Sequence, residues 1–129
     1  MPLVRISLSA SHSDQRKNAL SKAVHQALID EFKIPEDDYF HIIEVLGKSQ
    51  IKYPQEYLGI PHTDDIIFIQ IIAAVGRTID QKRNLYRSIA TLVEARTKIS
   101  SKDIIITLLE NQKENWSFGN GELQTFNHV

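Results

Sequence analysis

The two halves of the chain repeat each other at a shift of 65 residues. A stripe of apolar residues with helical spacing (i, i+4, i+7, i+8) in the first half recurs at the shifted positions in the second half. The stripes are Leu20, Val24, Ala27 and Leu28, and then Leu85, Ile89, Leu92 and Val93. Such self-similarity indicates that one supersecondary unit is used twice. The fold is therefore constrained to two copies of one unit.

The residues that flank these stripes agree at the same shift. Ser13 is of a type favoured at helix N-caps, and it aligns with Thr78. Thr78 has Gln81 three residues later, which is the spacing of a capping box. Further aligned pairs are Ile34 with Ile99 and Asp38 with Asp103. The agreement predicts helices near residues 14–32 and 79–97.

Each half is predicted to contain a strand, a long helix and a second strand. The predicted strands lie near residues 3–8, 39–46, 68–73 and 103–109. Two βαβ units with right-handed crossovers give a four-stranded sheet with both helices on one face. The predicted fold class is therefore α/β (α+β), a double βαβ repeat.

One domain covering residues 1–129 has room for both halves, which lie near residues 1–46 and 65–110. Residues 47–64 form a long connection between the halves, and connections of this length often line sites or subunit contacts. The tail beyond residue 110 contains two glycines separated by one residue, which predict a tight turn and a hairpin.

The predicted sheet has a second face that the helices do not reach. Residues 66–72 and 104–109 are apolar on both faces, as in sheets that are covered on both sides. Two helices cover only one face of four strands, and the sequence predicts no third layer. Another copy of the chain is the expected cover, so we expect a homo-oligomer.

Composition argues against several classes of partner and site. The net charge is −1 and no basic run occurs, which disfavours nucleic acid and anionic membranes as partners. No apolar stretch has membrane-spanning length, and the first residues lack a signal-peptide pattern. Cysteine is absent, which excludes disulfides and thiolate metal sites and leads us to expect a cytoplasmic location. The five histidines lack metal-ligand spacing, so neither a metal nor a cofactor is expected.

The chain begins Met1-Pro2 at the start of a predicted strand. Methionine aminopeptidases remove the initiating methionine when the next residue is small, and proline qualifies. Removal leaves a secondary amine at the chain terminus. Because α-amino groups have pKa values of about 7.7–8.0, such an amine can act as an acid or a base near neutral pH.

Five short segments, together with the Met1-Pro2 start, carry a family resemblance. They are residues 32–38, 58–60, 77–82, 110–111 and 115–121. On these segments the chain resembles the tautomerase superfamily, and within it the branch of malonate semialdehyde decarboxylase. The resemblance covers nearly the whole chain. It implies a trimer of double βαβ units, which agrees with the uncovered sheet face.

The resemblance also implies three catalytic positions. Pro2 matches the family's amino-terminal proline, which donates or accepts a proton at the substrate. Asp38 matches the catalytic aspartate, whose carboxylate can orient a water or hold the proton of the amine. Arg77 matches the family's substrate-binding arginine, and a guanidinium can hold a carboxylate through two parallel hydrogen bonds. The alternative for Asp38 is a structural turn residue, since Asp103 holds the repeat-equivalent position.

The tail contains three aromatic residues of interest, Trp116, Phe118 and Phe126. From the residues alone they are expected to cap the core, whereas the resemblance implies that they form a hydrophobic wall of the substrate pocket. One position departs from the family. The decarboxylase has a second arginine two residues before the substrate-binding one, and Val75 stands there in this chain. A single arginine weakens any assignment of a dicarboxylate substrate.

The expected function is an enzyme that uses Pro2 as acid or base on a small carboxylate-bearing oxo acid, most like malonate semialdehyde decarboxylase. Enol–keto tautomerisation of 2-oxo acids and hydration of an alkene acid stay open. A trimeric binding protein without catalysis is the third alternative, and Val75 favours it. The resting protonation state of Pro2 also stays open, because burial and Arg77 lower the pKa of the amine whereas Asp38 raises it.

Overall fold

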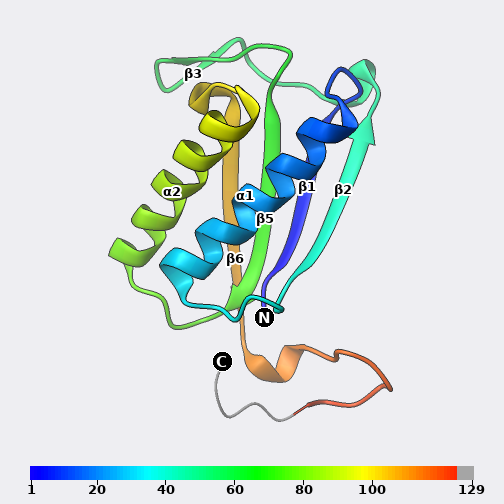
Figure 1. Ribbon diagram of the computed structural model, residues 1–129, viewed down its shortest axis with the longest axis vertical. Helices are drawn as coiled ribbons and strands as arrows, with labels where there is room; N and C mark the ends of the chain where they lie inside the picture. Colours follow the sequence, from blue (N-terminus) through cyan, green and yellow to red (C-terminus); the bar gives the residue numbers. More distant parts are fainter. Residues whose placement is uncertain (125–129) are drawn as a thin grey trace.

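The computed structural model describes residues 1–124 and consists of one four-stranded sheet with two long helices packed against it (Figure 1). The helices are α1 (Asp14–Phe32) and α2 (Ile79–Thr97). The strands of the sheet are β1 (Leu3–Ser9), β2 (Phe40–Leu46), β5 (Ile67–Ala74) and β6 (Ile104–Asn111). Both helices and all four strands lie where the repeat predicted them, so the predicted fold class is confirmed.

The strand order of the sheet is β2-β1-β5-β6. Within each half the two strands are parallel, and the halves join through the antiparallel pair of β1 and β5. The beginnings of β1 and β2 therefore lie at the same end of the sheet as the finishing ends of β5 and β6. We call this the amino-terminal end of the sheet, because the chain starts there.

The helix ends show the repeat in detail. The side chain of Ser13 accepts a hydrogen bond from the Arg16 backbone N–H, and Thr78 forms the predicted capping box with Gln81. Each helix then ends on a lysine in the left-handed conformation, Lys33 with φ 57° and Lys98 with φ 67°. The two halves thus begin and end their helices by the same local chemistry.

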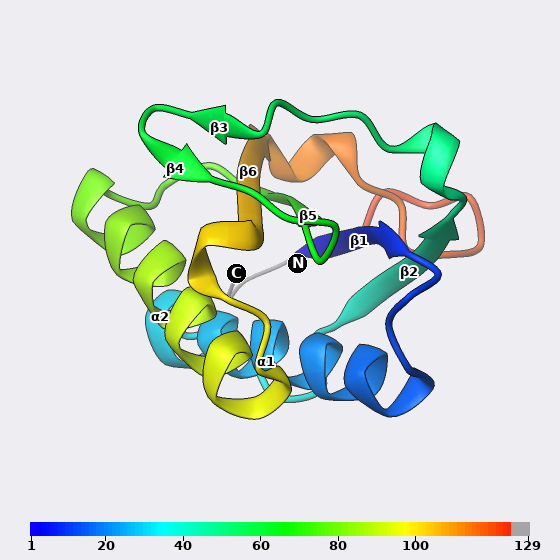
Figure 2. The same cartoon turned by 90° about the horizontal axis from the view of Figure 1, so that it is seen from above.

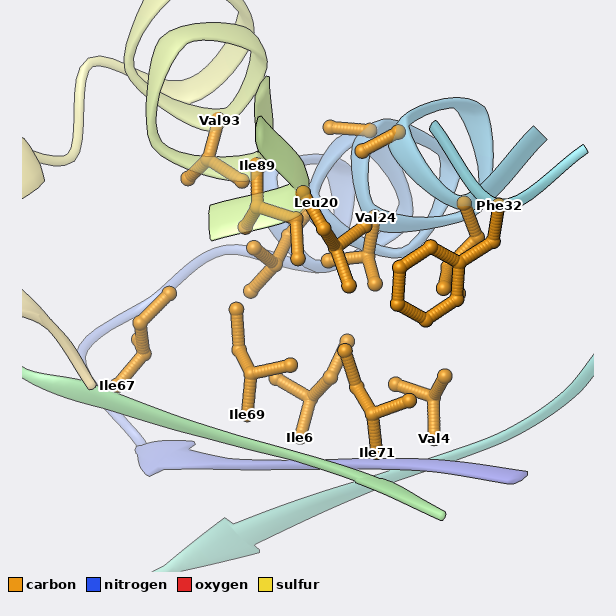
Figure 3. Close-up of a cluster of buried hydrophobic side chains, with 14 of the residues drawn as sticks. Val4, Ile6, Leu20, Val24, Phe32, Ile67, Ile69, Ile71, Ile89 and Val93 are labelled. Carbon is orange, nitrogen blue, oxygen red and sulfur yellow. The ribbon is translucent and has the colours of Figure 1, made fainter. Parts of the chain in front are cut away.

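The core lies between the helices and the sheet (Figure 3). Alternate residues of β1 and β5 point toward the helices, where they meet the two predicted stripes. The residues that are 0% exposed include Val4, Ile6, Leu8, Leu20, Val24, Ile67, Ile69, Ile71, Leu85, Ile89 and Val93. Burying each of the larger side chains contributes about 1.5–3 kcal/mol, so this layer supplies most of the driving force for folding. Of the predicted stripe residues, Leu92 is only partly buried at the edge of the core.

The opposite face of the sheet is covered by neither α1 nor α2 (Figure 2). At the amino-terminal end this face is apolar, because Leu3 pairs with Phe40 on one side and Ile72 on the other. Phe40 is 51% exposed. Further along the strands the face becomes polar, with a salt bridge of 3.2 Å between Arg5 and Glu44. The face is therefore mixed in character, although it leaves apolar side chains accessible for contact with another surface.

Two connecting segments differ from the sequence-based expectation. The long connection between the halves contains a 3-10 turn (Lys48–Gln50) and a small hairpin of β3 (Glu56–Tyr57) and β4 (Ile60–Pro61). The turn of that hairpin uses Leu58 and Gly59, both with positive φ. The tail contains a 3-10 turn (Lys113–Asn115) and a turn around its two glycines, but no strand up to residue 124. The hairpin predicted for the tail is thus not formed in its described part.

Neither α1 nor α2 has both the length and the apolar character needed to cross a membrane, and these are the long helices of residues 1–124.

Candidate functional site

The amino terminus of the chain forms an ion pair with Asp38. The amine of Met1 donates a hydrogen bond to the Asp38 carboxylate, and the Met1 residue is only 6% exposed. Sheet topology explains the pairing, because β1 and β2 run parallel and Leu3 lies opposite Phe40. The residues just before these two strands therefore meet at the amino-terminal end of the sheet. Asp38 sits in a turn in which its backbone N–H donates to the Pro35 carbonyl at 3.1 Å.

Pro2 is buried, and in the chain it lies between Met1 and Leu3, the first residue of β1. With Met1 in place its nitrogen belongs to a peptide bond and has no basic lone pair. The amine that meets Asp38 is therefore one residue away from Pro2 along the chain.

Arg77 reaches the same end of the sheet from the connection between β5 and α2. Antiparallel pairing of β1 with β5 brings the last residues of β5 beside the start of the chain. The Arg77 guanidinium donates to the Ala74 carbonyl at 3.0 Å and lies 4.6 Å from the centroid of the Phe32 ring. These contacts fix its direction, and the ring face stabilises its positive charge. Burial lowers the pKa of Arg77, while the carboxylates of Glu110 and Asp38 oppose that shift.

A cavity of about 60 Å³ joins these groups. Met1, Asp38 and Arg77 line it, together with the end of α1 and the last residue of β5. The further lining residues are Phe32, Lys33, Ile34, Pro35 and Ala74. The volume holds about two water molecules. Met1 thus shares this cavity with two of the candidate side chains that the sequence analysis named, Asp38 and Arg77.

The sequence did not single out Phe32 or Lys33 as site residues. Phe32 is the last residue of α1, and the guanidinium of Arg77 lies over its ring in a cation–π contact. The detectable signal was the helix C-terminus itself, because a helix that ends just before Asp38 must bring its last side chains to this place.

Position 75 is a valine and therefore offers no cation to the site. Its side chain is 45% exposed, and its backbone N–H donates to the Asn111 carbonyl at 2.9 Å. Lys33 does line the cavity, but its ammonium donates to the Asp30 carbonyl at 2.6 Å. Arg77 is therefore the cation best placed to bind an anion here.

The tail aromatics lie at the same end of the sheet but do not line this cavity. Trp116 donates from its indole nitrogen to the side chain of Asn111, the last residue of β6, at 2.6 Å. Its ring stacks on Phe118 with centroids 5.2 Å apart, and Phe118 stacks on Phe40 at 5.7 Å. The tail thus runs from β6 to β2 at the amino-terminal end of the sheet (Figure 1). Phe126, the third predicted aromatic, lies outside the described residues.

Within residues 1–124, no cluster of three or more histidine, cysteine, aspartate or glutamate side chains is arranged to hold a metal ion. The chemistry available at the site is that of an amine, a carboxylate and a guanidinium. A carboxylate beside an amine can hold or relay a proton, and a guanidinium can bind a carboxylate.

Comparison with known proteins places the chain in a family. A family model for tautomerase enzymes matches residues 38–119, and a second tautomerase model matches residues 2–46. The chain belongs to the tautomerase family. It is 41% identical over 124 residues to the probable tautomerase YusQ of Bacillus subtilis (strain 168), covering 96% of this chain and 98% of that protein.

Solved structures share the fold of this chain. FG41 malonate semialdehyde decarboxylase inhibited by 3-bromopropiolate is 31% identical with a TM-score of 0.88, covering 95% of this chain and 92% of that one. A fused 4-OT symmetric trimer is 21% identical with a TM-score of 0.77, covering 93% and 94%, and shows likeness of fold alone. The chain is a tautomerase-family enzyme of the branch that resembles malonate semialdehyde decarboxylase.

Proposed function

We propose that removal of Met1 makes Pro2 the catalytic acid or base of an enzyme acting on a small carboxylate-bearing oxo acid. The observation that carries this proposal is the ion pair between the terminal amine and Asp38, in a cavity that Arg77 also lines. Removal of Met1 transfers the terminal amine to the Pro2 nitrogen and vacates the space that Met1 fills.

Each group then has one role in the proposal. The protonated Pro2 amine donates its proton to the substrate, or the neutral amine accepts one. Asp38 holds the proton of the amine or orients a water. Arg77 binds the substrate carboxylate, with its direction set by the Ala74 carbonyl and the Phe32 ring.

The preferred reaction is decarboxylation of a 3-oxo acid such as malonate semialdehyde. The bond between the carboxylate and the α-carbon breaks and carbon dioxide leaves. The electron pair of that bond moves into the developing enolate, which then takes up a proton at the α-carbon to give the aldehyde. A protonated Pro2 stabilises the negative charge that forms on the carbonyl oxygen. Similarity to FG41 malonate semialdehyde decarboxylase at 31% identity supports this choice.

The second candidate is enol–keto tautomerisation of a 2-oxo acid. Val75 favours it, because a site with one arginine has less means to polarise a carbonyl while it holds a carboxylate. Tautomerisation requires only a base that removes one proton and returns it to another atom. Similarity to the probable tautomerase YusQ at 41% identity also supports this candidate. A catalytically silent binding protein is the outcome if neither reaction occurs.

The deciding experiment is proton NMR of malonate semialdehyde with processed wild type and with Pro2→Ala, after mass spectrometry confirms the loss of Met1. We expect acetaldehyde to form with wild type and to form much more slowly with Pro2→Ala. Equal rates for the two proteins contradict the proline mechanism. If malonate semialdehyde is not consumed, the same pair of proteins is tested on the enol of phenylpyruvate, and no turnover there leaves the silent binding protein.

We further propose that the chain forms a homotrimer through the uncovered face of the sheet. Exposed apolar side chains such as Phe40, and the likeness of fold to a fused 4-OT trimer, support this arrangement. Light scattering after size exclusion measures the assembly directly. We expect a mass three times the 14.8 kDa of one chain, and a monomer contradicts the proposal.

A further inference from the structure

A histidine of α1 holds the segment that carries Asp38. The Nε2 nitrogen of His25 lies 2.7 Å from the Glu36 carbonyl oxygen, so the ring N–H donates to that carbonyl. The same ring packs against Tyr39 with centroids 5.0 Å apart. Glu36 and Tyr39 lie on either side of Asp38 in the chain. His25 therefore contacts the Asp38 segment both before and after the carboxylate.

A second histidine packs His25 in place. His41 of β2 meets the His25 ring edge to face with centroids 6.0 Å apart, and its Nδ1 lies 2.8 Å from the Ser21 hydroxyl of α1. Burial and the nearby His25 lower the pKa of His41 to about 4. His41 is thus uncharged at neutral pH and packs against His25 without charge repulsion.

This cluster is separate from the cavity that holds Met1 and Arg77. His25, Tyr39 and His41 line a groove between α1 and β2 of about 720 Å³. The cavity at the chain terminus shares none of these residues. His25 therefore contacts the Asp38 segment through the Glu36 carbonyl and Tyr39, and it does not line the cavity that Met1, Asp38 and Arg77 share.

The second half of the chain shows that the fold does not need a histidine at this position. Ala90 is the repeat equivalent of His25. The segment before Asp103 is held instead by the Glu94 carboxylate, which accepts from the Ser101 backbone N–H at 2.9 Å, and by the Ser100 hydroxyl, which accepts from the Lys102 N–H at 3.2 Å. The first half has no such groups, because the positions equivalent to Glu94 and Ser100 are Ile29 and Pro35.

We propose that His25 is a positioning residue for Asp38. Its hydrogen bond to the Glu36 carbonyl and its contact with Tyr39 hold the Asp38 carboxylate beside the terminal amine, which the proposed function places at the reacting atoms. This inference rests on the proposed function of Asp38 and Pro2. Displacement of a reacting or orienting group by about 1 Å can cost up to 100-fold in rate, so a fixed segment matters for catalysis.

The test compares four variants of the protein that lacks Met1: His25→Ala, His25→Gln, Asp38→Asn and the control Gln26→Ala. Gln26 neighbours His25 on α1 and bonds to Asp30 at 2.8 Å, away from the Asp38 segment. The first readout is the titration midpoint of the terminal amine by NMR. The second is kcat and KM for malonate semialdehyde, or for the enol of phenylpyruvate if that is the substrate turned over.

We expect His25→Ala to shift the amine midpoint to lower pH, in the same direction as Asp38→Asn, because a carboxylate stabilises the protonated amine. We also expect kcat to fall about tenfold with KM within twofold, since the substrate carboxylate is bound elsewhere. His25→Gln keeps an N–H donor and restores most of the midpoint and rate, and Gln26→Ala behaves as wild type.

The outcomes separate the two proposals. A midpoint that moves in Asp38→Asn but not in His25→Ala overturns the positioning role and leaves the proposed function intact. If Asp38→Asn changes neither midpoint nor rate, the proposed function itself fails. If His25→Ala does not fold, His25→Gln decides, and a folded His25→Gln that behaves like Asp38→Asn overturns the role of the N–H donor.

Discussion

Asp38 and Asp103 hold equivalent positions in the two halves of the molecule, yet their surroundings differ. Asp103 is 3% exposed, and its carboxylate accepts from both the backbone N–H of Thr63, at 2.7 Å, and the Thr63 hydroxyl. Asp38 instead meets the charged terminus of the chain and lines a cavity. One carboxylate is paired with a fixed neutral group, whereas the other faces a group that can exchange protons.

The arginine of the site has a similarly different counterpart. The repeat equivalent of Arg77 is His12, which is 3% exposed. Burial and the neighbouring Arg16 lower the pKa of His12, so it offers no positive charge at neutral pH. The equivalent of Pro2 is Ile67, in the interior of the chain. The comparison teaches that repeat-equivalent positions can carry different chemistry, and that the amine, carboxylate and guanidinium that the proposed function uses meet at the end of the sheet with the chain terminus.

The largest effect is expected when the carboxylate of the first half loses its charge. Asp38→Asn in the protein without Met1 should lower kcat/KM by about 100-fold or more, because general acid–base groups contribute about 10²–10⁴-fold. The unfolding free energy should change little, since the asparagine amide oxygen can still accept a hydrogen bond from the terminal amine. Steady-state kinetics and urea unfolding measure the two effects. Unchanged kinetics would make Asp38 the structural turn residue that Asp103 is.

Arg77→His places at the candidate site the residue type that stands at the repeat-equivalent position, His12. We expect KM for a carboxylate substrate to rise about 10- to 100-fold, since a hydrogen bond to a charged group contributes about 1.5–3 kcal/mol. Arg77→Lys should recover only part of the loss, because an ammonium cannot bind a carboxylate with two parallel hydrogen bonds. Kinetics at several substrate concentrations separate KM from kcat. An unchanged KM contradicts the binding role.

Asp103→Asn tests the structural side of the comparison. We expect the free energy of unfolding to fall by about 1–3 kcal/mol. The asparagine amide has only one acceptor oxygen, so one of the two Thr63 donors loses its hydrogen-bond partner. The kcat/KM of the folded protein should stay within about twofold of wild type, as expected for a site at the other end of the sheet. Urea unfolding at one fixed protein concentration measures the loss. Lower activity at unchanged stability would give Asp103 a role that its contacts do not indicate.

The sequence predicts the scaffold well because the scaffold is specified locally. The stripe that contains Leu20, the cap at Ser13 and the capping box at Thr78 each depend on residues within one or two helical turns. The tail was not predicted, because Phe118 stacks on Phe40, far away in the sequence and in no periodic relation to it.

The roles of the two aspartates could not be separated from the repeat alone. Their partners are the Met1 amine at the chain terminus and Thr63 in the connection between the halves, and both lie outside the aligned helices. The resemblance to a known family chose Asp38, and the structure shows that its partner is a charged group. Sequence periodicity thus predicts where side chains are placed, but contacts between distant segments determine what they do.

The smallest effect concerns the pH dependence of stability. The pKa of His41 is lowered to about 4 in the folded protein, whereas the unfolded value is near 6.5. The unfolded chain therefore takes up a proton on His41 between pH 6.5 and 4, whereas the folded chain does not. The contribution of neutral His41 to the free energy of unfolding is thus fully present above pH 6.5 and is lost as the pH falls toward 4.

The variant His41→Ile has the residue of the equivalent position in the second half, Ile106. We expect this variant to lose less unfolding free energy between pH 7 and 4 than wild type, while the buried His12 keeps part of the dependence. Urea unfolding at pH 7, 5.5 and 4 measures the slope. An equal slope in both proteins contradicts a neutral, buried His41 and shows that acid sensitivity comes from other groups.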